Sequence, residues 1–481
     1  MRRTKIVATV GPATSDREML ELMVEAGMDI ARINCSHADH GTVARVIEDL
    51  REISQEMDKP VGILLDLSGP KIRTGIMAGS IPVRLYTGQK FILTSRKIEG
   101  TAHAVSTNYP KLALEVRVQD TILLDDGLIE LIVLDTDETD VVCEVVNGGI
   151  LKNKKGINLP GVRLSIPAVT EKDKVDLDFG LKQEVDFVAL SFVRDPDDVT
   201  YLKKLIGDHW PPVSVIAKLE KPEALEHLDE ILDVADGVMI ARGDLGVELP
   251  PERVPAAQKL ITKKANAIGK PVITATQMLE SMIENPRPTR AEASDVANAI
   301  FDGTDAVMLS GETAAGKYPV EAIKMMGRIA AAAEGTVDYD ELKKHKTPSS
   351  AHAIAHAACA MAVDMKAKAI AAFTKSGSTA RLISQFRPPT PIIALTQQTH
   401  VYRQVALCWG VVPIMLTEVR DSEGTLAMVE ETLLKKGFVV SGDSMIITGG
   451  LPIAARGAAN FVKLSVIPQK LSGRYREQKG I

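Results

Sequence analysis

Residues 213–220 read VSVIAKLE, and the interpretation of the whole fold starts from this stretch. Its apolar residues are typical of a buried strand, which ends in a lysine and a glutamate two positions apart. Because side chains alternate along an extended backbone, Lys218 and Glu220 leave from the same face. The pair is either an incidental ion pair at a strand end or a functional pair, in which Lys218 stabilises negative charge on a substrate and Glu220 holds a divalent cation.

An alternation of strand and helix extends from this stretch in both directions. Three strands precede residue 70 and five follow residue 166, and amphipathic helices separate them. We expect these eight strands at residues 5–10, 29–34, 61–66, 186–192, 213–220, 236–244, 271–277 and 305–313. This pattern is typical of a (β/α)8 TIM barrel within the α/β class, and such barrels have their active sites at the C-terminal ends of the strands.

A β-rich insertion interrupts the alternation. It contains short runs such as FILTS, TILLD, LIELIVL and VVCEVV, no convincing helix, and a predicted hairpin turn at residues 125–127. We therefore expect residues 1–69 and 167–337 to form a discontinuous barrel and residues 70–166 to form a lid domain over it.

The C-terminal part, residues 345–481, is predicted to be an open α/β domain. Its expected strands are residues 369–374, 392–396, 411–416, 438–442 and 444–450, with helices between them.

Composition limits the possible functions. The chain has 481 residues, 45% of them hydrophobic and 25% charged, which is typical of a globular protein of about three domains. A net charge of −6 argues against nucleic-acid binding, and no apolar run is long enough for a signal peptide or a membrane span. Four scattered cysteines without a C-x-x-C pair indicate reduced thiols and a cytoplasmic protein.

Polar residues gather at the ends of six expected strands. They are Arg32, Asn34 and Ser36; Asp66; Lys218 and Glu220; Arg242, Gly243 and Asp244; Thr274 and Thr276; and Ser310, Gly311 and Glu312. Glu220 and Asp244 suit one hard divalent ion, and Arg32 offers a bidentate fork to a phosphate or carboxylate. The predicted site takes a small anionic substrate, and its chemistry is proton or phosphoryl transfer.

Motifs along nearly the whole chain, in the same order, resemble the pyruvate kinase family. They are MRRTKIVATVGPAT, ARINCSH, DLSGPKIRTG, KKGINLPG, IAKLEKPEAL, MIARGDLGVELP, the run from TATQMLES to AAGKYP, and TKSGSTAR. The resemblance implies phosphoryl transfer from phosphoenolpyruvate to ADP, which yields ATP and an enolate that is protonated to pyruvate. It also implies a homotetramer with a regulatory, oligomerising C-terminal domain.

The resemblance also implies roles for individual residues. Lys218 matches the lysine that stabilises the transition state, and Arg32 matches the phosphate-binding arginine. Glu220 and Asp244 match the ligands of the protein-bound Mg²⁺. The family's groups around the substrate carboxylate correspond in this chain to Gly243, Asp244 and Thr276. Thr276 also corresponds to the group on the side where the enolate is protonated. The family's nucleotide-binding residues correspond in this chain to Asn34, His37, Arg73 and Lys155. The resemblance implies a catalytic role for Arg73 as well.

One departure concerns K⁺. Many family members read DTKGPEIR where this chain has DLSGPKIR at residues 66–73, so Leu67 replaces a threonine associated with K⁺ and Lys71 replaces a glutamate. An ammonium group can supply the positive charge that K⁺ would bring. We therefore expect K⁺-independent activity, with Asn34, Ser36 and Asp66 still lining the pocket.

Three further signals have competing interpretations. The loop Thr374, Lys375, Ser376, Gly377, Ser378 and Thr379 is either an ordinary turn or, as in regulated pyruvate kinases, the site of a phosphorylated effector, whether sugar bisphosphate, sugar monophosphate or AMP. The G-x-x-x-x-G-K match at residues 311–317 is read as a false P-loop, because Tyr318 replaces the required Ser or Thr. His352, His356 and Cys359 are read as packing residues and not as metal ligands.

Two rival functions stay open at this point. Another metal-dependent barrel that handles enolates, such as an aldolase or a phosphoenolpyruvate mutase relative, would explain Glu220, Asp244 and Gly243 but not the lid with Lys155. A catalytically silent sensor of phosphorylated metabolites would not need Lys218 or Thr276.

Overall fold

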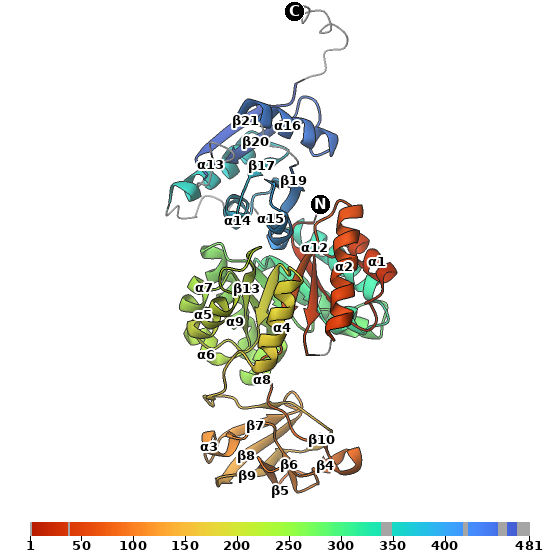
Figure 1. Ribbon diagram of the computed structural model, residues 1–481, viewed down its shortest axis with the longest axis vertical. Coiled ribbons are helices and arrows are strands. Elements are labelled where there is room, and N and C mark those ends of the chain that lie inside the picture. Colours follow the sequence, from red (N-terminus) through yellow and green to blue (C-terminus); the bar gives the residue numbers. More distant parts are fainter. Residues whose placement is uncertain (1, 37–38, 338–348, 417–421, 451–458, 469–481) are drawn as a thin grey trace, which may run out of the picture.

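Eight parallel strands close into a barrel in the middle of the computed structural model (Figure 1), which describes residues 2–36, 39–337, 349–416, 422–450 and 459–468. In barrel order the strands are β1 (Lys5–Val10), β2 (Ile30–Asn34), β3 (Gly62–Asp66), β12 (Phe187–Leu190), β13 (Ser214–Leu219), β14 (Gly237–Ala241), β15 (Val272–Ala275) and β16 (Ala306–Leu309). The predicted barrel is confirmed, with three strands before the insertion and five after it.

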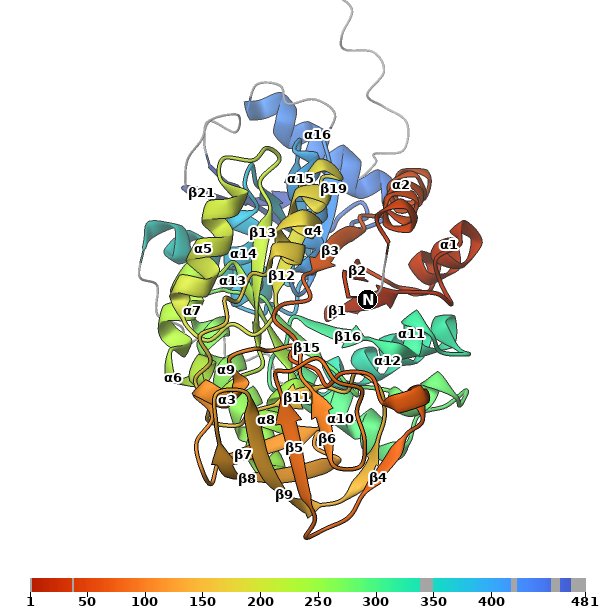
Figure 2. The same cartoon turned by 60° about the horizontal axis from the view of Figure 1, so that its bottom comes forward.

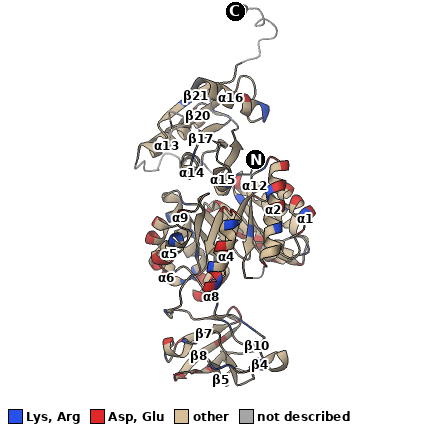
Figure 3. Cartoon of the chain, viewed as in Figure 1, with Lys and Arg blue, Asp and Glu red and all other residues tan. Residues whose placement is uncertain are grey.

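Helices surround the barrel and bury one face each against it. They are α1 (Arg17–Ala26), α2 (His40–Glu56), α4 (Glu171–Lys182), α5 (Pro196–Ile206), α6 (Pro222–Glu226), α7 (Leu228–Val234), α9 (Val254–Ala267), α10 (Arg290–Phe301) and α12 (Pro319–Glu334). In α2, for example, Val43, Val46, Ile47 and Leu50 recur at helical spacing and are buried. Figure 3 shows both signs of charge interspersed on α1, α2 and α5, as expected for solvated helix faces.

The insertion forms its own β structure below the barrel in Figure 1. A six-stranded sheet has the order β11 (Ile157–Asn158), β7 (Thr121–Leu124), β8 (Ile129–Thr136), β9 (Asp140–Asn147), β5 (Lys90–Thr94) and β6 (Ala104–Ser106), and β10 (Gly149–Leu151) pairs with β4 (Val83–Leu85). Strands β7 and β8 are antiparallel, which confirms the predicted hairpin. The expectation of no helix was wrong in detail, because a short helix, α3 (Leu112–Glu115), and the 3-10 turn Ala78–Ser80 occur here.

The C-terminal part is an open α/β sheet with the order β19 (Val411–Met415), β18 (Ile392–Thr396), β17 (Ile370–Phe373), β20 (Ser444–Gly449) and β21 (Phe461–Val466). Helices α13 (Ser350–Asp364), α14 (Ser378–Gln385), α15 (Thr399–Gln404) and α16 (Ser422–Lys435) connect or cover it. The expected strand at residues 438–442 is absent, because the chain turns there after α16. The strand that completes the sheet is instead β21, which pairs antiparallel with β20.

The C-terminal part closes the N-terminal end of the barrel. Ala406 and Leu407 belong to the same buried cluster as the side chains that fill the barrel interior. Next to them Arg403 Nε lies 2.9 Å from Asp186 Oδ1, and Arg51 Nη2 lies 3.0 Å from Asp186 Oδ2. This end is therefore filled by apolar side chains and paired charges. The opposite rim, which faces the β-rich insertion in Figure 1 and Figure 2, is left for chemistry. None of the described helices is long and apolar enough to span a membrane.

Candidate active site

Lys218 lies in a buried group of charges at the C-terminal end of β13. Its ammonium Nζ is 2.9 Å from Glu220 Oε1, 3.3 Å from Asp66 Oδ1, and donates a hydrogen bond to Ser191 Oγ at 2.7 Å. The Lys218 side chain is 10% exposed and that of Glu220 is 1% exposed. The two side chains do share one face, and their burial argues against an incidental surface ion pair.

The neighbouring charges set the protonation states in this group. Burial lowers the pKa of Lys218, but the carboxylates of Asp66 and Glu220 outweigh burial and raise it overall. Burial raises the pKa of Asp66, but the cations Lys218 and Arg32 outweigh it and hold this pKa below its usual value. Lys218 is therefore a permanent cation and Asp66 a permanent anion at neutral pH.

Glu220 behaves differently. Burial raises its pKa; Lys218 opposes that shift, the negative charge of Asp244 adds to it, and the net shift is upward. Its second oxygen, Oε2, accepts a hydrogen bond from the Phe192 backbone N–H at 2.7 Å. Phe192 has a φ of +58°, so this N–H is aimed by a backbone conformation that non-glycine residues rarely adopt.

Arg32 is held rigidly on β2. Its Nε donates to Asp66 Oδ2 at 2.8 Å, its Nη2 lies 2.6 Å from the same oxygen, and its Nη1 donates to Thr9 Oγ1 at 2.9 Å. A guanidinium has five N–H donors, so these contacts leave part of its fork available to an anion.

The polar residues after β14 were placed on the wrong kind of element. Strand β14 ends at Ala241, and Arg242, Gly243 and Asp244 begin the short helix α8 (Arg242–Glu248). The Gly243 N–H donates to Thr276 Oγ1 at 2.7 Å, and Thr276 has a φ of +68°. The side chain of Asp244 makes no hydrogen bond or ion pair with any residue that the structure describes.

Two expected rim residues have structural roles. Thr274 is fully buried and its hydroxyl donates to Thr304 Oγ1 at 2.9 Å, so it does not reach the site. Glu312 turns inward, where its carboxylate accepts from the backbone N–H groups of Leu279 at 3.0 Å and Ser310 at 2.7 Å. A cleft of about 720 Å³ is lined by Glu312 and by Gly243, Asp244 and Thr276, among others.

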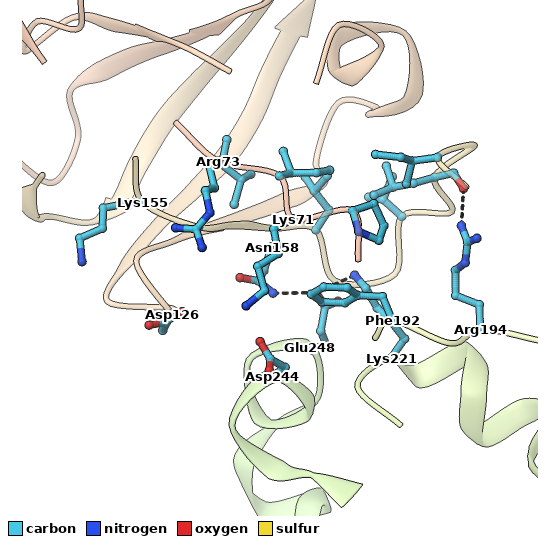
Figure 4. Close-up of a pocket in the computed structure, with 18 of the residues that line it drawn as sticks. Lys71, Arg73, Asp126, Lys155, Asn158, Phe192, Arg194, Lys221, Asp244 and Glu248 are labelled. Carbon is cyan, nitrogen blue, oxygen red and sulfur yellow. Dashed lines mark hydrogen bonds and ion pairs between the residues drawn. The ribbon is translucent and has the colours of Figure 1, made fainter. Parts of the chain in front are cut away.

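A second cleft, of about 270 Å³, lies between the lid and the barrel (Figure 4). Lys71, Arg73 and Lys155 line its lid side, and Asp244 lines its barrel side. Lys155 Nζ pairs with Asp125 Oδ1 at 2.7 Å, and Arg73 Nη1 donates to the Lys154 carbonyl at 3.1 Å. Arg73 and Lys155 thus line a cleft whose barrel side includes Asp244.

The loops after β2 and β3 approach each other where the cation pocket was expected. Asn34 Oδ1 accepts from the Ser36 N–H at 3.0 Å, and Ser36 Oγ donates to Ser68 Oγ at 3.0 Å. Leu67 is fully buried in the apolar core and so offers no side-chain oxygen. Lys71 is exposed. His37 lies outside the described residues.

The predicted effector loop faces a third cleft, of about 510 Å³, between β17–α14 and the barrel. Thr374 Oγ1 is buried there without a hydrogen-bond partner, and α14 starts after Gly377 without a side-chain cap. Lys375, Ser376, Ser378 and Thr379 line the cleft as well. Unpaired backbone N–H groups at a helix start favour an anion.

The sequence analysis missed two contributors. Ser191 holds Lys218, and Glu248 on α8 accepts from Asn158 Nδ2 of the lid at 3.0 Å and pairs with Lys221 Nζ at 2.7 Å. Ser191 directly follows β12, whose end was not among the six strand ends considered, and it could have been found by that position. Glu248 had no such signal.

The discounted motifs have structural roles. Gly311 opens the short helix α11 (Gly311–Ala314), and Lys317 pairs with Glu284, so neither residue forms a phosphate loop. Cys359 is fully buried, and His356 packs edge-on against Phe386. Within the described residues no cluster of three or more His, Cys, Asp or Glu could hold a metal on protein ligands alone.

Comparisons with known proteins agree with this geometry. The family model for the pyruvate kinase barrel domain matches residues 1–323, and the model for the pyruvate kinase alpha/beta domain matches residues 352–465. Pyruvate kinases of Staphylococcus aureus strains MRSA252 and bovine RF122 are each 47% identical over 478 residues, which cover 98% of this chain and 82% of theirs. A crystal structure of a pyruvate kinase from Cryptosporidium parvum superposes with a TM-score of 0.92 at 38% identity and covers 97% of this chain and 96% of its own. Because the family models match both the barrel and the C-terminal part, these comparisons favour neither the aldolase nor the silent-sensor alternative. The chain belongs to the pyruvate kinase family.

Proposed function

We propose that this enzyme transfers the phosphoryl group of phosphoenolpyruvate to ADP and releases ATP and pyruvate. The observation that carries the proposal is the buried Lys218 ammonium, held by Asp66, Glu220 and Ser191 beside the uncompensated Asp244. A cation that the protein holds in place in a poorly hydrated site strongly stabilises the negative charge that develops on the enolate. The site does not have to reorganise during the reaction.

The remaining barrel residues orient phosphoenolpyruvate. The free part of the Arg32 fork binds the phosphoryl group, while the contacts with Asp66 and Thr9 hold the guanidinium still. Gly243 and Thr276 contact the substrate carboxylate. The Thr276 hydroxyl, which donates to the Ala275 carbonyl at 2.6 Å and accepts from the Gly243 N–H at 2.7 Å, lies on the side from which the enolate takes its proton.

Glu220 and Asp244 fit an Mg²⁺ ion. Burial, with a smaller contribution from the negative charge of Asp244, raises the pKa of Glu220, and a divalent cation would relieve the repulsion between these two carboxylates. Two carboxylates are a usual protein share for Mg²⁺, which completes its shell with water and substrate oxygens. When bound, Mg²⁺ supplies positive charge that neutralises substrate oxygens during transfer.

The nucleotide binds in the cleft between lid and barrel, where Arg73 and Lys155 present their charges to its phosphates. Asn34 and His37 contact it from the barrel side. A second Mg²⁺ enters with ADP. The lid, residues 70–166, moves over the barrel formed by residues 1–69 and 167–337.

The reaction does not require K⁺. Leu67 supplies no side-chain oxygen ligand, and the Lys71 ammonium replaces the charge of a monovalent ion at the pocket of Asn34, Ser36 and Asp66.

A phosphorylated effector binds at residues 374–379. The uncapped start of α14 and the unpaired Thr374 hydroxyl support this proposal over an ordinary turn. The chain acts as a cytoplasmic homotetramer, and residues 345–481 form its regulatory and oligomerising domain.

The deciding experiment measures pyruvate formation from phosphoenolpyruvate and ADP with Mg²⁺, in potassium-free buffer and with KCl at constant ionic strength. We expect equal rates in both buffers and a fall on the order of 10²–10³-fold in kcat for Lys218→Met. A large stimulation by KCl would refute K⁺ independence alone. No pyruvate in either buffer would refute the function itself.

A further inference from the structure

Helix α8 ends in a glutamate, Glu248, for which the reaction described above has no role. Its side chain is only 1% exposed, although a carboxylate in the last turn of a helix opposes the helix dipole. Its Oε1 lies 2.7 Å from Lys221 Nζ and accepts from Asn158 Nδ2 of the lid at 3.0 Å. Its Oε2 is buried without a hydrogen-bond partner in the part of the chain that the structure describes. A buried carboxylate needs a cation beside it, and Lys221 is that cation.

Lys221 stands at a stiff point of the chain. It follows Glu220 directly, and it precedes Pro222, the first residue of α6. A residue before proline is restricted to extended backbone conformations, and Lys221 has a φ of −123° and a ψ of 146°. Its side chain is 12% exposed, so water screens its contact with Glu248 only weakly. The Lys221 ammonium is therefore a fixed point next to one of the two carboxylates that we assign to Mg²⁺.

The other assigned carboxylate, Asp244, lies on α8 itself, four residues before Glu248. Residues four apart are about one turn apart on the same face of a helix, and both line the cleft between lid and barrel together with Lys221 (Figure 4). The start of α8 is held on the barrel by the hydrogen bond from the Gly243 N–H to Thr276 Oγ1. Its end is held by the ion pair of Glu248 and Lys221. This pair thus joins the segment that carries Asp244 to the segment after β13.

The position of Asp244 depends on where α8 lies. Glu220 is fixed by Lys218 and by the Phe192 N–H, whereas the side chain of Asp244 makes no hydrogen bond or ion pair with any described residue. Mg²⁺ demands near-ideal octahedral geometry, while Ca²⁺ accepts a more flexible arrangement with longer distances. A site for Mg²⁺ therefore needs its two carboxylates at a set separation.

We propose that Lys221 and Glu248 are positioning residues of the divalent-cation site: their ion pair fixes the end of α8 against the segment after β13 and so sets the separation of Asp244 and Glu220. This inference rests on the proposed function, which assigns the cation to those two carboxylates. Residues that hold metal ligands in place without touching the metal typically contribute on the order of 10–100-fold to its affinity.

The test measures Mn²⁺ binding to the full-length enzyme by electron paramagnetic resonance, without substrates and with Mg²⁺ and Ca²⁺ as competitors. It compares Lys221→Met and Glu248→Gln with Lys264→Met. The control also removes a lysine–carboxylate pair, in which Lys264 Nζ lies 2.8 Å from Asp229 Oδ2, but these side chains are 38% and 71% exposed. We expect Mg²⁺ binding to weaken on the order of tenfold in both test variants and to stay unchanged in the control.

Charge and position predict opposite results for Lys221→Met. If the lysine acted only through its charge, its loss would tighten the binding of a divalent cation, whereas Glu248→Gln would weaken it. A positioning role predicts weaker binding in both variants and a smaller loss for Ca²⁺ than for Mg²⁺. Lys221→Arg, which keeps the ion pair, should restore most of the affinity. The double variant should bind no more weakly than either single variant, because the two residues act as a unit.

Circular dichroism of each variant tests its folding, and Glu248→Gln and the double variant carry the comparison if Lys221→Met does not fold. Tighter or unchanged Mg²⁺ binding in Lys221→Met, or equal losses for Mg²⁺ and Ca²⁺, would overturn the positioning role. A parent enzyme that binds no Mn²⁺, or Mn²⁺ binding that survives Glu220→Gln, would instead overturn the cation assignment in the proposed function, and this inference with it.

Discussion

Asp186 at the N-terminal end of the barrel and Glu220 at the C-terminal end are both buried carboxylates, but their surroundings differ. Asp186 is 1% exposed and lies between two guanidinium groups, those of Arg51 and Arg403. Glu220 is equally buried, yet it shares its cation, Lys218, with Asp66 and stands near the unpaired Asp244. Two cations therefore surround the single carboxylate of Asp186, whereas several carboxylates share the single ammonium of Lys218.

This difference separates a docking interface from a binding site. At the N-terminal end, pairing and apolar packing hold the C-terminal part in place and leave nothing for a ligand to satisfy. At the C-terminal end, the excess of carboxylates and the positive φ angles of Phe192 and Thr276 carry a cost in the free protein. A bound cation and anionic substrate would relieve that cost. Changes at the two ends should therefore affect stability and activity separately.

The largest effect is expected for Asp186→Ala. It leaves the partly exposed Arg51 and the buried Arg403 without the carboxylate between them, which should lower the free energy of unfolding by about 3–5 kcal/mol. Urea unfolding followed by circular dichroism measures this, and kcat per folded molecule should stay within about twofold. Asp178→Ala, which removes the exposed ion pair between Asp178 and Lys182 on α4, should cost less than about 1 kcal/mol. A fall in kcat at unchanged stability would contradict the separation of roles.

Glu220→Gln should show the opposite pattern. We expect kcat to fall on the order of 10²–10³-fold, because a ligand of the proposed Mg²⁺ is lost. The pKa of Glu220 is raised in the folded protein, so its ionised form is less favourable there than in the unfolded chain. The neutral side chain should consequently leave the melting temperature unchanged or raise it, as differential scanning calorimetry would show. A clearly lower melting temperature would mean that the pair with Lys218 outweighs the effect of burial.

The raised pKa of Glu220 also predicts a pH dependence. As pH falls toward this pKa, Glu220 takes up a proton before an ordinary glutamate would and ceases to be a cation ligand. The apparent affinity for Mg²⁺ should therefore weaken by up to about tenfold per pH unit on the acidic side. Asp66 stays ionised over this range, because its pKa is lowered. Titrating activity with Mg²⁺ at several pH values measures the effect, and an affinity independent of pH would contradict it.

The smallest effect is expected at the contact between lid and barrel. Asn158→Ala removes the hydrogen bond from β11 to Glu248, a contact worth about 1 kcal/mol, or roughly fivefold in an equilibrium. We expect a more open lid and KM for ADP raised by no more than that factor. Susceptibility of the lid to limited proteolysis reports the opening directly. An unchanged cleavage rate would show that this bond does not hold the lid.

Much of the fold followed from local patterns. Continuous apolar strands alternating with amphipathic helices can be buried on both faces only in a parallel sheet, and eight of them fit a barrel. The prediction was wrong where the pattern is weak. Residues 438–440 are apolar but lie in the turn that follows α16, whereas β21 exists because it pairs with the edge of β20. That pairing joins strands that local sequence alone does not place together.

The sequence by itself determined which groups stand at the strand ends, because alternation on an extended backbone puts Lys218 and Glu220 on one face. The sequence also contains the set of motifs by which the family is recognised. Only the tertiary structure decided their electrostatic state. The raised pKa of Glu220, which burial and the nearby Asp244 cause, and the support of Lys218 by Ser191 arise between residues that are distant in the chain. Local sequence fixes the direction of a side chain, whereas its pKa and its partners depend on what burial brings around it.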